Sequence, residues 1–279
     1  MSIFYVDGQF VPAQQAQIPV DDLAILRGYG VFDFMRTYQG HPIFLREHVL
    51  RLENSAREIG LDFPWSREEV ADLVWQTLKR NPHSESNIRI VITGGSSQDF
   101  ITPQGNPRLL ILVTPLVAPP DHWYSDGVKI ITVAMKRSFP RAKSIDYIAA
   151  TIALKQARRQ GAVEAVYVDP RGCVLEGTTS NLFLFLGEKL VTPDEGVLSG
   201  ITRKVILEIA RQQFPIELRD VQRQELLSAD EVFISASNKG LVPVVRVDES
   251  MIGSGKPGER SRALIKAMTE YTSRLAARR

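Results

Sequence analysis

The chain has 279 residues, of which 44% are hydrophobic, enough for one large or two ordinary domains with sizeable cores. Its 34 basic and 32 acidic side chains nearly balance, which argues against partners such as nucleic acid or an anionic membrane. No apolar run could cross a bilayer, and the first residues lack the basic flank and apolar core of a secretory signal. The single cysteine excludes an internal disulfide, and the four histidines lack metal-ligand spacing. We therefore expect a globular cytoplasmic protein without a metal site.

The first part of the chain predicts a sheet with helices. Residues 3–12 should form a hairpin, because Asp7-Gly8 separates two apolar runs. Ser66 and Glu69 have the spacing of a capping box for a helix that runs to about residue 79. The loop at 94–107 is rich in Gly, Ser, Pro and Asn and is long enough to act as a substrate lid. Further strands are expected at residues 35–38, 43–44, 88–92 and 109–113, and a helix at 47–59.

Paired prolines at 119 and 120 mark a stiff linker, where we place the domain boundary. Residues 1–117 then form a small N-terminal domain, 118–121 the linker, and 122–279 a larger C-terminal domain that would bind a cofactor. The second domain is expected to have strands at 128–135, 165–168, 174–175, 181–186, 190–191, 231–235 and 242–247, and helices at 146–160, 203–212 and 260–276.

A lysine and a glutamate stand out in the second domain. Lys143 lies in a short polar joint between a strand and a helix, and Glu176 ends the next strand pair. An amine and an acid on adjacent elements suit pyridoxal phosphate, because the amine forms a Schiff base with the aldehyde and the acid keeps the pyridine nitrogen protonated. Asp146 is expected to cap the following helix, whose positive end, with Arg141, would favour the neutral amine. Considered alone, Lys143 could be a solvated loop lysine and Glu176 an acid facing water.

Two turns could bind an anion. The stretch Gly200-Ile201-Thr202 opens a helix, so its backbone N–H groups and the Thr202 hydroxyl could hold a phosphate. Ordinary N-capping by Ser199 or Thr202 is the alternative. Ser237 and Asn238 follow a strand and could add donors, although Ser-Asn is also plain turn chemistry.

Arg51 is a third candidate for the phosphate, because its planar fork suits such an anion. It lies one helical turn from both His48 and Ser55, so the three could share a polar face. A surface arginine on the predicted helix is the alternative.

Two further residues could contact a ligand. Arg27 could bind a substrate carboxylate or form a structural ion pair with Asp21, Asp22 or Asp33. Tyr147 could bond the phenolic oxygen of the cofactor or pack on its helix.

Four motifs follow one another at characteristic intervals. They are Glu-His-Val-Leu-Arg-Leu around Arg51, Lys-Ser-Ile-Asp at Lys143, Glu-Gly-Thr-Thr-Ser-Asn-Leu-Phe at Glu176, and Leu-Ser-Gly-Ile-Thr-Arg from Leu198. In this order they resemble the class IV aminotransferases of pyridoxal phosphate fold type IV. That family contains branched-chain aminotransferases, D-amino acid aminotransferases and aminodeoxychorismate lyase. The resemblance covers nearly the whole chain.

The resemblance implies a fold, a cofactor and roles for single residues. The fold is α/β (α+β), a small α/β domain joined to a larger domain with a barrel-like sheet, the cofactor lying between them. Lys143 would be the Schiff-base lysine and the base that moves the proton, and Glu176 would pair with the pyridine nitrogen. The phosphate would be held by Arg51, Ile201, Thr202 and Ser237, with Leu198 against the ring. Family members are at least homodimers, so a second copy of the chain is an expected partner.

The resemblance leaves the substrate open between branched-chain L-amino acids and D-amino acids, with a 2-oxo acid such as 2-oxoglutarate as acceptor. Phe32 is similar to the branched-chain pattern, but Asn87 stands two residues before Arg89, where those enzymes have a tyrosine. Atypical D-amino acid enzymes carry an arginine like Arg27, together with an arginine near Thr179 that is absent here. The candidate substrate contacts are Arg27, Phe32, Arg89, Thr179 and Asn238.

Two other activities are alternatives. A lyase is less expected, because the usual lyase surroundings of the lysine are missing. A binding or regulatory protein on a decayed enzyme scaffold is opposed by the intact Lys143, Glu176 and Arg51.

Overall fold

The computed structural model describes residues 2–277, whose contacts group the chain into two compact units. The first unit contains the residues up to Val117, the segment Arg141–Asp146 and the residues from Thr272. The second contains Ala118–Pro140 and Tyr147–Tyr271. The segment that carries Lys143 thus makes its contacts with the N-terminal unit, although the sequence assigned it to the C-terminal domain. The domain limits themselves stay a prediction.

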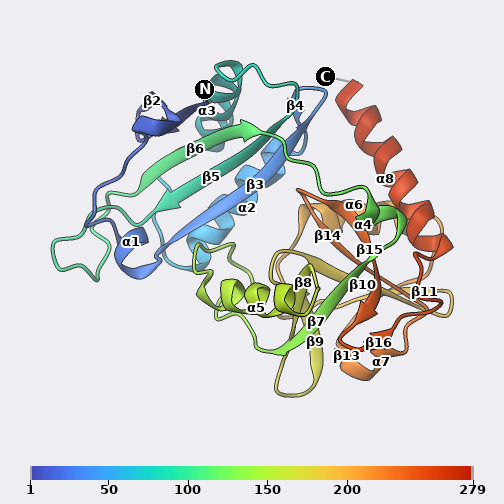
Figure 1. Ribbon diagram of the computed structural model, residues 1–279. Helices are drawn as coiled ribbons and strands as arrows, with labels where there is room; N and C mark the ends of the chain where they lie inside the picture. The colour runs from blue at the N-terminus through green and yellow to red at the C-terminus, as the bar shows by residue number, and fades with distance from the viewer. Residues whose placement is uncertain (1, 278–279) are drawn as a thin grey trace. The chain divides into compact units, whose positions relative to one another are not determined.

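The first unit is built on a six-stranded antiparallel sheet in the order β2-β1-β6-β5-β3-β4 (Figure 1). The predicted hairpin at its edge is confirmed. The strands are β1 (Ile3–Val6), β2 (Gln9–Pro12), β3 (Gly30–Tyr38), β4 (His41–Pro42), β5 (Ser86–Thr93) and β6 (Arg108–Pro115).

One face of this sheet is covered by α2 (Leu45–Glu58) and α3 (Arg67–Lys79) (Figure 1). Isoleucines alternate along β5 at 88, 90 and 92 and are fully buried against helix residues such as Leu52 and Val74. Each such side chain contributes about 1.5–3 kcal/mol of transfer free energy. The capping box of Ser66 and Glu69 is confirmed, whereas α2 begins two residues earlier than predicted, at Leu45.

Short helices complete this unit. The turn η1 (Ala13–Gln15) follows β2. The helix α1 (Leu23–Arg27) was not predicted, and it begins where the Asp22 carboxylate accepts a hydrogen bond from the Ala24 N–H at 2.8 Å. The terminal helix α8 (Glu259–Ala277) ends in this unit.

The second unit contains a ten-stranded mixed sheet in the order β12-β11-β10-β14-β15-β7-β8-β9-β13, with β16 paired to β15 (Figure 1). The pairs β11–β12, β15–β7 and β7–β8 are parallel and the other pairs are antiparallel. The strands are β7 (Val128–Ala134), β8 (Glu164–Val168), β9 (Cys173–Gly177), β10 (Asn181–Leu186), β11 (Lys189–Thr192), β12 (Ile216–Leu218), β13 (Val221–Gln222), β14 (Glu231–Ala236), β15 (Gly240–Val247) and β16 (Ser250–Met251).

The central strands β10 and β14 are buried on both faces, which is why they read as continuous apolar runs. On one face, leucines and valines form the main core of the unit. On the other face, the Phe183 and Phe233 rings stack with centroids 4.7 Å apart.

Helices flank this sheet. They are α4 (His122–Ser125), α5 (Ile148–Arg159), α6 (Ile201–Ala210), α7 (Arg223–Leu227) and the first part of α8. Two predicted helix starts were wrong. Helix α5 begins at Ile148 with Tyr147 at the N-cap position and no side-chain cap, so Asp146 does not cap it. Helix α6 begins at Ile201 rather than Arg203.

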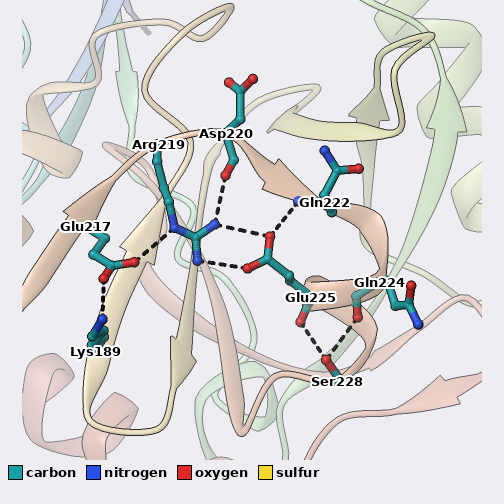
Figure 2. Close-up of polar contacts among 8 residues, drawn as sticks. All are labelled: Lys189, Glu217, Arg219, Asp220, Gln222, Gln224, Glu225 and Ser228. Atoms are coloured by element: carbon teal, nitrogen blue, oxygen red, sulfur yellow. Dashed lines mark hydrogen bonds and ion pairs between the residues drawn. The ribbon is translucent and has the colours of Figure 1, made fainter.

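A polar network ties β11, β12 and α7 together near the edge of this sheet (Figure 2). Arg219 donates to Glu217 at 2.9 Å and to Glu225 at 2.8 and 3.1 Å, and Lys189 donates to Glu217 at 2.5 Å. These side chains are partly or largely exposed, so the pairs add little to the stability of the fold. Among residues 2–277, no helix combines the length and the apolar character needed to cross a bilayer.

Candidate functional site

The Lys143 segment lies along the edge of β3. The Phe32 N–H donates to the Lys143 carbonyl at 2.9 Å, and the Ile145 N–H donates to the Gly30 carbonyl at 3.0 Å. On the helix side, the Lys143 N–H donates to the Ser55 hydroxyl at 3.1 Å. The backbone at Lys143 is therefore fixed both by a strand and by α2, which gives its amine a defined starting point.

A buried carboxylate lies on the helix side of β3. Asp33 accepts from Arg51 through both oxygens at 2.8 Å, and His48 Nδ1 lies 2.7 Å from Asp33 Oδ1. Burial alone would raise the pKa of Asp33, but the Arg51 guanidinium and the His48 ring hold it well below its usual range. Burial also lowers the pKa of His48, so this ring is neutral near pH 7.

The polar face predicted for α2 is present, with His48, Arg51 and Ser55 all directed toward neighbours in this unit. Sequence reasoning missed Asp33 as their partner and considered it only for Arg27. The available signal was that Asp33 lies two residues after Val31, so both side chains are on the same face of β3. Val31 is apolar and buried, and this face is the one that packs against α2.

The opposite face of β3 brings two cations to one aromatic ring. The Phe32 ring centroid lies 4.8 Å from Lys143 Nζ and 4.9 Å from the Arg89 guanidinium carbon. The register of β3 and β5 explains this, since Phe34 pairs with Arg89. Phe32 is buried and Arg89 is exposed. The structure thus groups three sequence-predicted residues around a patch that would attract an anionic group.

Arg27 does not form the structural ion pair offered as an alternative. It is exposed at the end of α1 and donates to the Leu26 carbonyl at 2.8 Å. Within the described part of the chain it makes no ion pair with Asp21, Asp22 or Asp33, because Asp22 caps α1 and Asp33 binds Arg51.

In the second unit, Glu176 is buried and firmly held. One oxygen accepts from Arg137 at 2.9 Å, and the other accepts from the Leu198 N–H at 3.0 Å. The Asn181 amide lies 3.4 Å from the second oxygen and also donates to the Leu198 carbonyl at 2.9 Å. The alternative of a strand-end acid facing water is therefore wrong. Sequence reasoning missed Arg137 and Asn181 as its partners.

The start of α6 offers donors for an anion. Gly200 occupies the N-cap position of α6, so neither Ser199 nor Thr202, which were the alternative N-caps, is the N-cap residue. A Cβ at Gly200 would overlap the Asn181 amide oxygen, which explains why glycine stands there. The Thr202 hydroxyl lies 3.5 Å from the Ser237 hydroxyl. Two predicted phosphate donors are thus adjacent, beside the first-turn N–H groups.

The remaining candidates have different surroundings. The Thr179 hydroxyl donates to Glu164 at 2.7 Å and accepts from Lys239 at 3.1 Å. Asn238 is exposed in the turn after β14. Tyr147 is half-buried at the start of α5, close enough to affect Tyr167, whose pKa burial raises to about 12.

Known proteins resemble this chain over almost all of its length. A family model described as amino-transferase class IV matches residues 30–247. A putative branched-chain-amino-acid aminotransferase of Methanocaldococcus jannaschii is 33% identical over 270 residues, covering 93% of each chain. A D-alanine aminotransferase of Staphylococcus haemolyticus is 29% identical over 279 residues, covering 97% of this chain and 98% of the relative.

A solved structure matches the arrangement as well as the sequence. This branched-chain amino acid aminotransferase from Escherichia coli has a TM-score of 0.91 and is 25% identical to the chain. The match covers 98% of this chain and 95% of that one.

Proposed function

Because this chain belongs to the class IV aminotransferases and is a transaminase of mixed α/β fold type IV architecture, we propose that it binds pyridoxal phosphate through Lys143 and moves amino groups from branched-chain L-amino acids to a 2-oxo acid. Enzymes of this family use that cofactor. The observation that carries the proposal is the buried Glu176 carboxylate, held by Arg137 and the Leu198 N–H. Such an acid suits a protonated pyridine nitrogen.

The residues of the chain fit the cofactor chemically. Pyridoxal phosphate requires an amine, an acid for its ring nitrogen and an anion site for its phosphate. Lys143 supplies the amine and Glu176 supplies the acid. The start of α6 supplies N–H donors at Ile201 and Thr202, with the Ser237 hydroxyl beside the Thr202 hydroxyl.

When bound, the cofactor supplies an aldehyde that takes up amines and a ring that withdraws electrons from the reacting carbon. Lys143 Nζ would hold the aldehyde and would be the base that takes the proton from the substrate Cα. Hydrogen bonds with Phe32 and Ser55 fix the backbone of Lys143, and so the point from which its side chain extends. Glu176 keeps the ring nitrogen protonated, and Arg137 keeps Glu176 in place.

Three further residues are assigned to the cofactor. Arg51 supports the phosphate by its positive charge, with Nε and Nη2 fixed by Asp33. Leu198 packs against the ring, and its backbone is fixed by Glu176 and Asn181. Tyr147 bonds the phenolic oxygen.

Substrate recognition is assigned to the groups around Phe32. An aromatic ring flanked by Arg89 offers an apolar surface beside a cation, which suits an amino acid with an apolar side chain and a carboxylate. Thr179 and Asn238 complete the substrate contacts. D-amino acids are the second candidate, because the Arg27 guanidinium is exposed and makes no ion pair among the described residues.

We also propose that the enzyme works in the cytoplasm as a homodimer. The homodimer is supported by Ile148 and Ile152, which lie one turn apart on α5 and are 74% and 61% exposed. Such apolar surface is commonly covered by a second copy of the chain.

The test combines absorbance with half-reactions. Purified protein with pyridoxal phosphate should show the visible band of the lysine-bound cofactor, Lys143→Ala should lose it, and Lys155→Ala, an exposed lysine of α5, should keep it. L-Leucine and L-glutamate should convert the spectrum of the wild type. An unchanged band in Lys143→Ala would overturn the assignment of the lysine.

The same half-reactions decide the substrate. Conversion by D-alanine and D-glutamate alone would establish the second candidate. Release of pyruvate from aminodeoxychorismate without an amino acceptor would indicate a lyase instead.

A further inference from the structure

A buried ion pair lies close to the residues assigned to the cofactor, yet has no part in that assignment. Glu164 in β8 is fully buried, and Lys239 in the turn between β14 and β15 is 7% exposed. Lys239 Nζ donates to Glu164 Oε2 at 3.2 Å. An apolar pair of similar volume is often as stabilising as a buried ion pair, so stability alone does not explain these charges.

Glu164 organises the loop that joins β9 to β10. The hydroxyls of Thr178, Thr179 and Ser180 all donate to its carboxylate, those of Thr179 and Ser180 at 2.7 and 2.9 Å. We call residues 178–180 the hydroxyl loop. A Cβ at Gly177 would overlap the Ser180 hydroxyl, so the chain lies close against the carboxylate.

The hydroxyl loop is bounded by the acid assigned to the ring nitrogen and by a residue that lies beside this acid. Glu176 precedes it, and Asn181, which lies beside Glu176, follows it. The Thr179 hydroxyl uses its one hydrogen in the hydrogen bond to Glu164. Any hydrogen bond that Thr179 donates to substrate must therefore come from its backbone N–H.

Lys239 connects this loop to a second one. It donates to the Thr179 hydroxyl at 3.1 Å as well as to Glu164. Its own carbonyl accepts from the Tyr124 hydroxyl at 2.8 Å, and its N–H closes the turn onto the Ala236 carbonyl at 3.2 Å. The turn of residues 237–239, which carries Ser237 and Asn238, is thus bridged to the hydroxyl loop through one amine.

We propose that the Glu164–Lys239 pair is a positioning device for transamination, which sets the hydroxyl loop and the turn of residues 237–239 in the relative position that binds the amino acid. The inference deepens the proposed function and rests on it. Neither Glu164 nor Lys239 is assigned a contact with substrate or cofactor. They act through the Thr179 and Asn238 backbone.

The electrostatics agree with this geometry. Burial would raise the pKa of Glu164, but Lys239 and the three hydroxyls hold it below the usual range. The carboxylate is therefore ionised at neutral pH, and the loop is held by charge-assisted hydrogen bonds, which are stronger than neutral ones.

The decisive variant removes both charges at once. Glu164→Gln/Lys239→Met leaves no unpaired buried charge, so the protein should fold and keep the cofactor absorbance band. A neutral amide has one acceptor oxygen and cannot take all three hydroxyl protons. The KM for the amino acid should rise at least tenfold while kcat changes less than threefold.

The matched control is Lys129→Met/Glu249→Gln, which removes an exposed ion pair of the same residue types from the same unit. Its KM should stay within twofold of the wild type. A folded, cofactor-bound Glu164→Gln/Lys239→Met enzyme with the KM of the wild type would overturn the proposal.

A second pair of variants decides the matter even if the double variant fails to fold. Thr178→Ser keeps a hydroxyl for Glu164 and should keep the KM within twofold. Thr178→Val has nearly the same volume without the hydroxyl and should raise the KM several-fold. Equal KM values for the two would overturn the proposal. A wild-type protein without the cofactor band would instead overturn the proposed function, which separates the two failures.

Discussion

Asp33 is a buried carboxylate of the first unit that contacts both an arginine and a histidine. It is fully buried, and both of its oxygens are used by the Arg51 guanidinium, with the neutral His48 ring beside them. Taking a carboxylate out of water is costly unless such partners are in place. Asp33 in β3 therefore fixes the orientation of the Arg51 guanidinium, which is assigned to the phosphate.

We expect Asp33→Asn to lower the free energy of unfolding by about 3 kcal/mol near neutral pH, because it leaves a nearly buried Arg51 without its counter-charge. The folded-state pKa of Asp33 is depressed, so its contribution is present above the unfolded pKa of about 4 and is lost as the pH falls toward the folded value. The difference between variant and wild type should shrink by about 1 kcal/mol from pH 5 to pH 3. Urea denaturation at both pH values measures it.

The control for this prediction is Asp72→Asn, which removes an exposed carboxylate of α3 and should change stability by about 0.5 kcal/mol or less. A difference for Asp33→Asn that stays constant from pH 5 to pH 3 would contradict the depressed pKa.

Single residues of the candidate site divide into those readable from sequence and those that are not. Lys143 and Glu176 became candidates because their motifs occur in a characteristic order along the chain. Their partners were missed, since Arg137 lies 39 residues from Glu176 and Ser55 lies 88 residues from Lys143. Contacts across such separations depend on strand pairing, which a single sequence does not specify.

At the scale of elements, the start of α6 links two parts of the site. Gly200 lets the helix begin against the Asn181 side chain, which in turn lies beside Glu176. The donors proposed for the phosphate and the residue beside the proposed acid therefore share one close contact.

We expect Gly200→Ala to weaken cofactor binding at least tenfold and to lower stability by about 1–3 kcal/mol, because the added methyl group displaces the Asn181 amide. Titration of the apoenzyme with pyridoxal phosphate, followed by absorbance, measures the affinity. Glu195→Ala, in the exposed part of the preceding loop, should bind as the wild type does. Unaltered affinity in Gly200→Ala would mean that Asn181 can move without consequence.

Long elements with strong local signals were predicted well. The capping box of α3 and the β1–β2 hairpin appear where the sequence put them. The strands β12, β13 and β16 were missed, since they have only two or three residues each and form through pairing with longer neighbours. The start of α5 was misplaced because a nearby aspartate is a good cap in general but does not cap this helix.

At the scale of the whole molecule, the class IV aminotransferase fold was predicted by the order of four motifs rather than by periodicity. Helix and strand periodicity gave the elements but could not indicate that the segment Arg141–Asp146 groups with the N-terminal unit. That grouping depends on hydrogen bonds to β3 and α2.

Cofactor binding should stabilise the folded protein by mass action. At a free concentration of 100 times Kd, pyridoxal phosphate should add about 2.7 kcal/mol, a rise in Tm of roughly 5–10 °C. Pyridoxal, which lacks the phosphate, should give a clearly smaller rise, because the donors of α6 and Ser237 have no anion to bind. Differential scanning calorimetry of the apoenzyme with each compound measures this. Equal shifts would contradict a phosphate site at α6.

The segment from Gly30 to Phe32 bonds to the chain near Lys143, more than a hundred residues further on. A fragment that ends at the linker of residues 118–121 would lack the Lys143 segment. The backbone groups of Gly30 and Phe32 that bond to it would then have no partner from that segment. Bare strand edges recruit other chains, so such a fragment should aggregate unless the lysine segment is supplied with it. The segment that carries Lys143 thus also covers this part of the β3 edge.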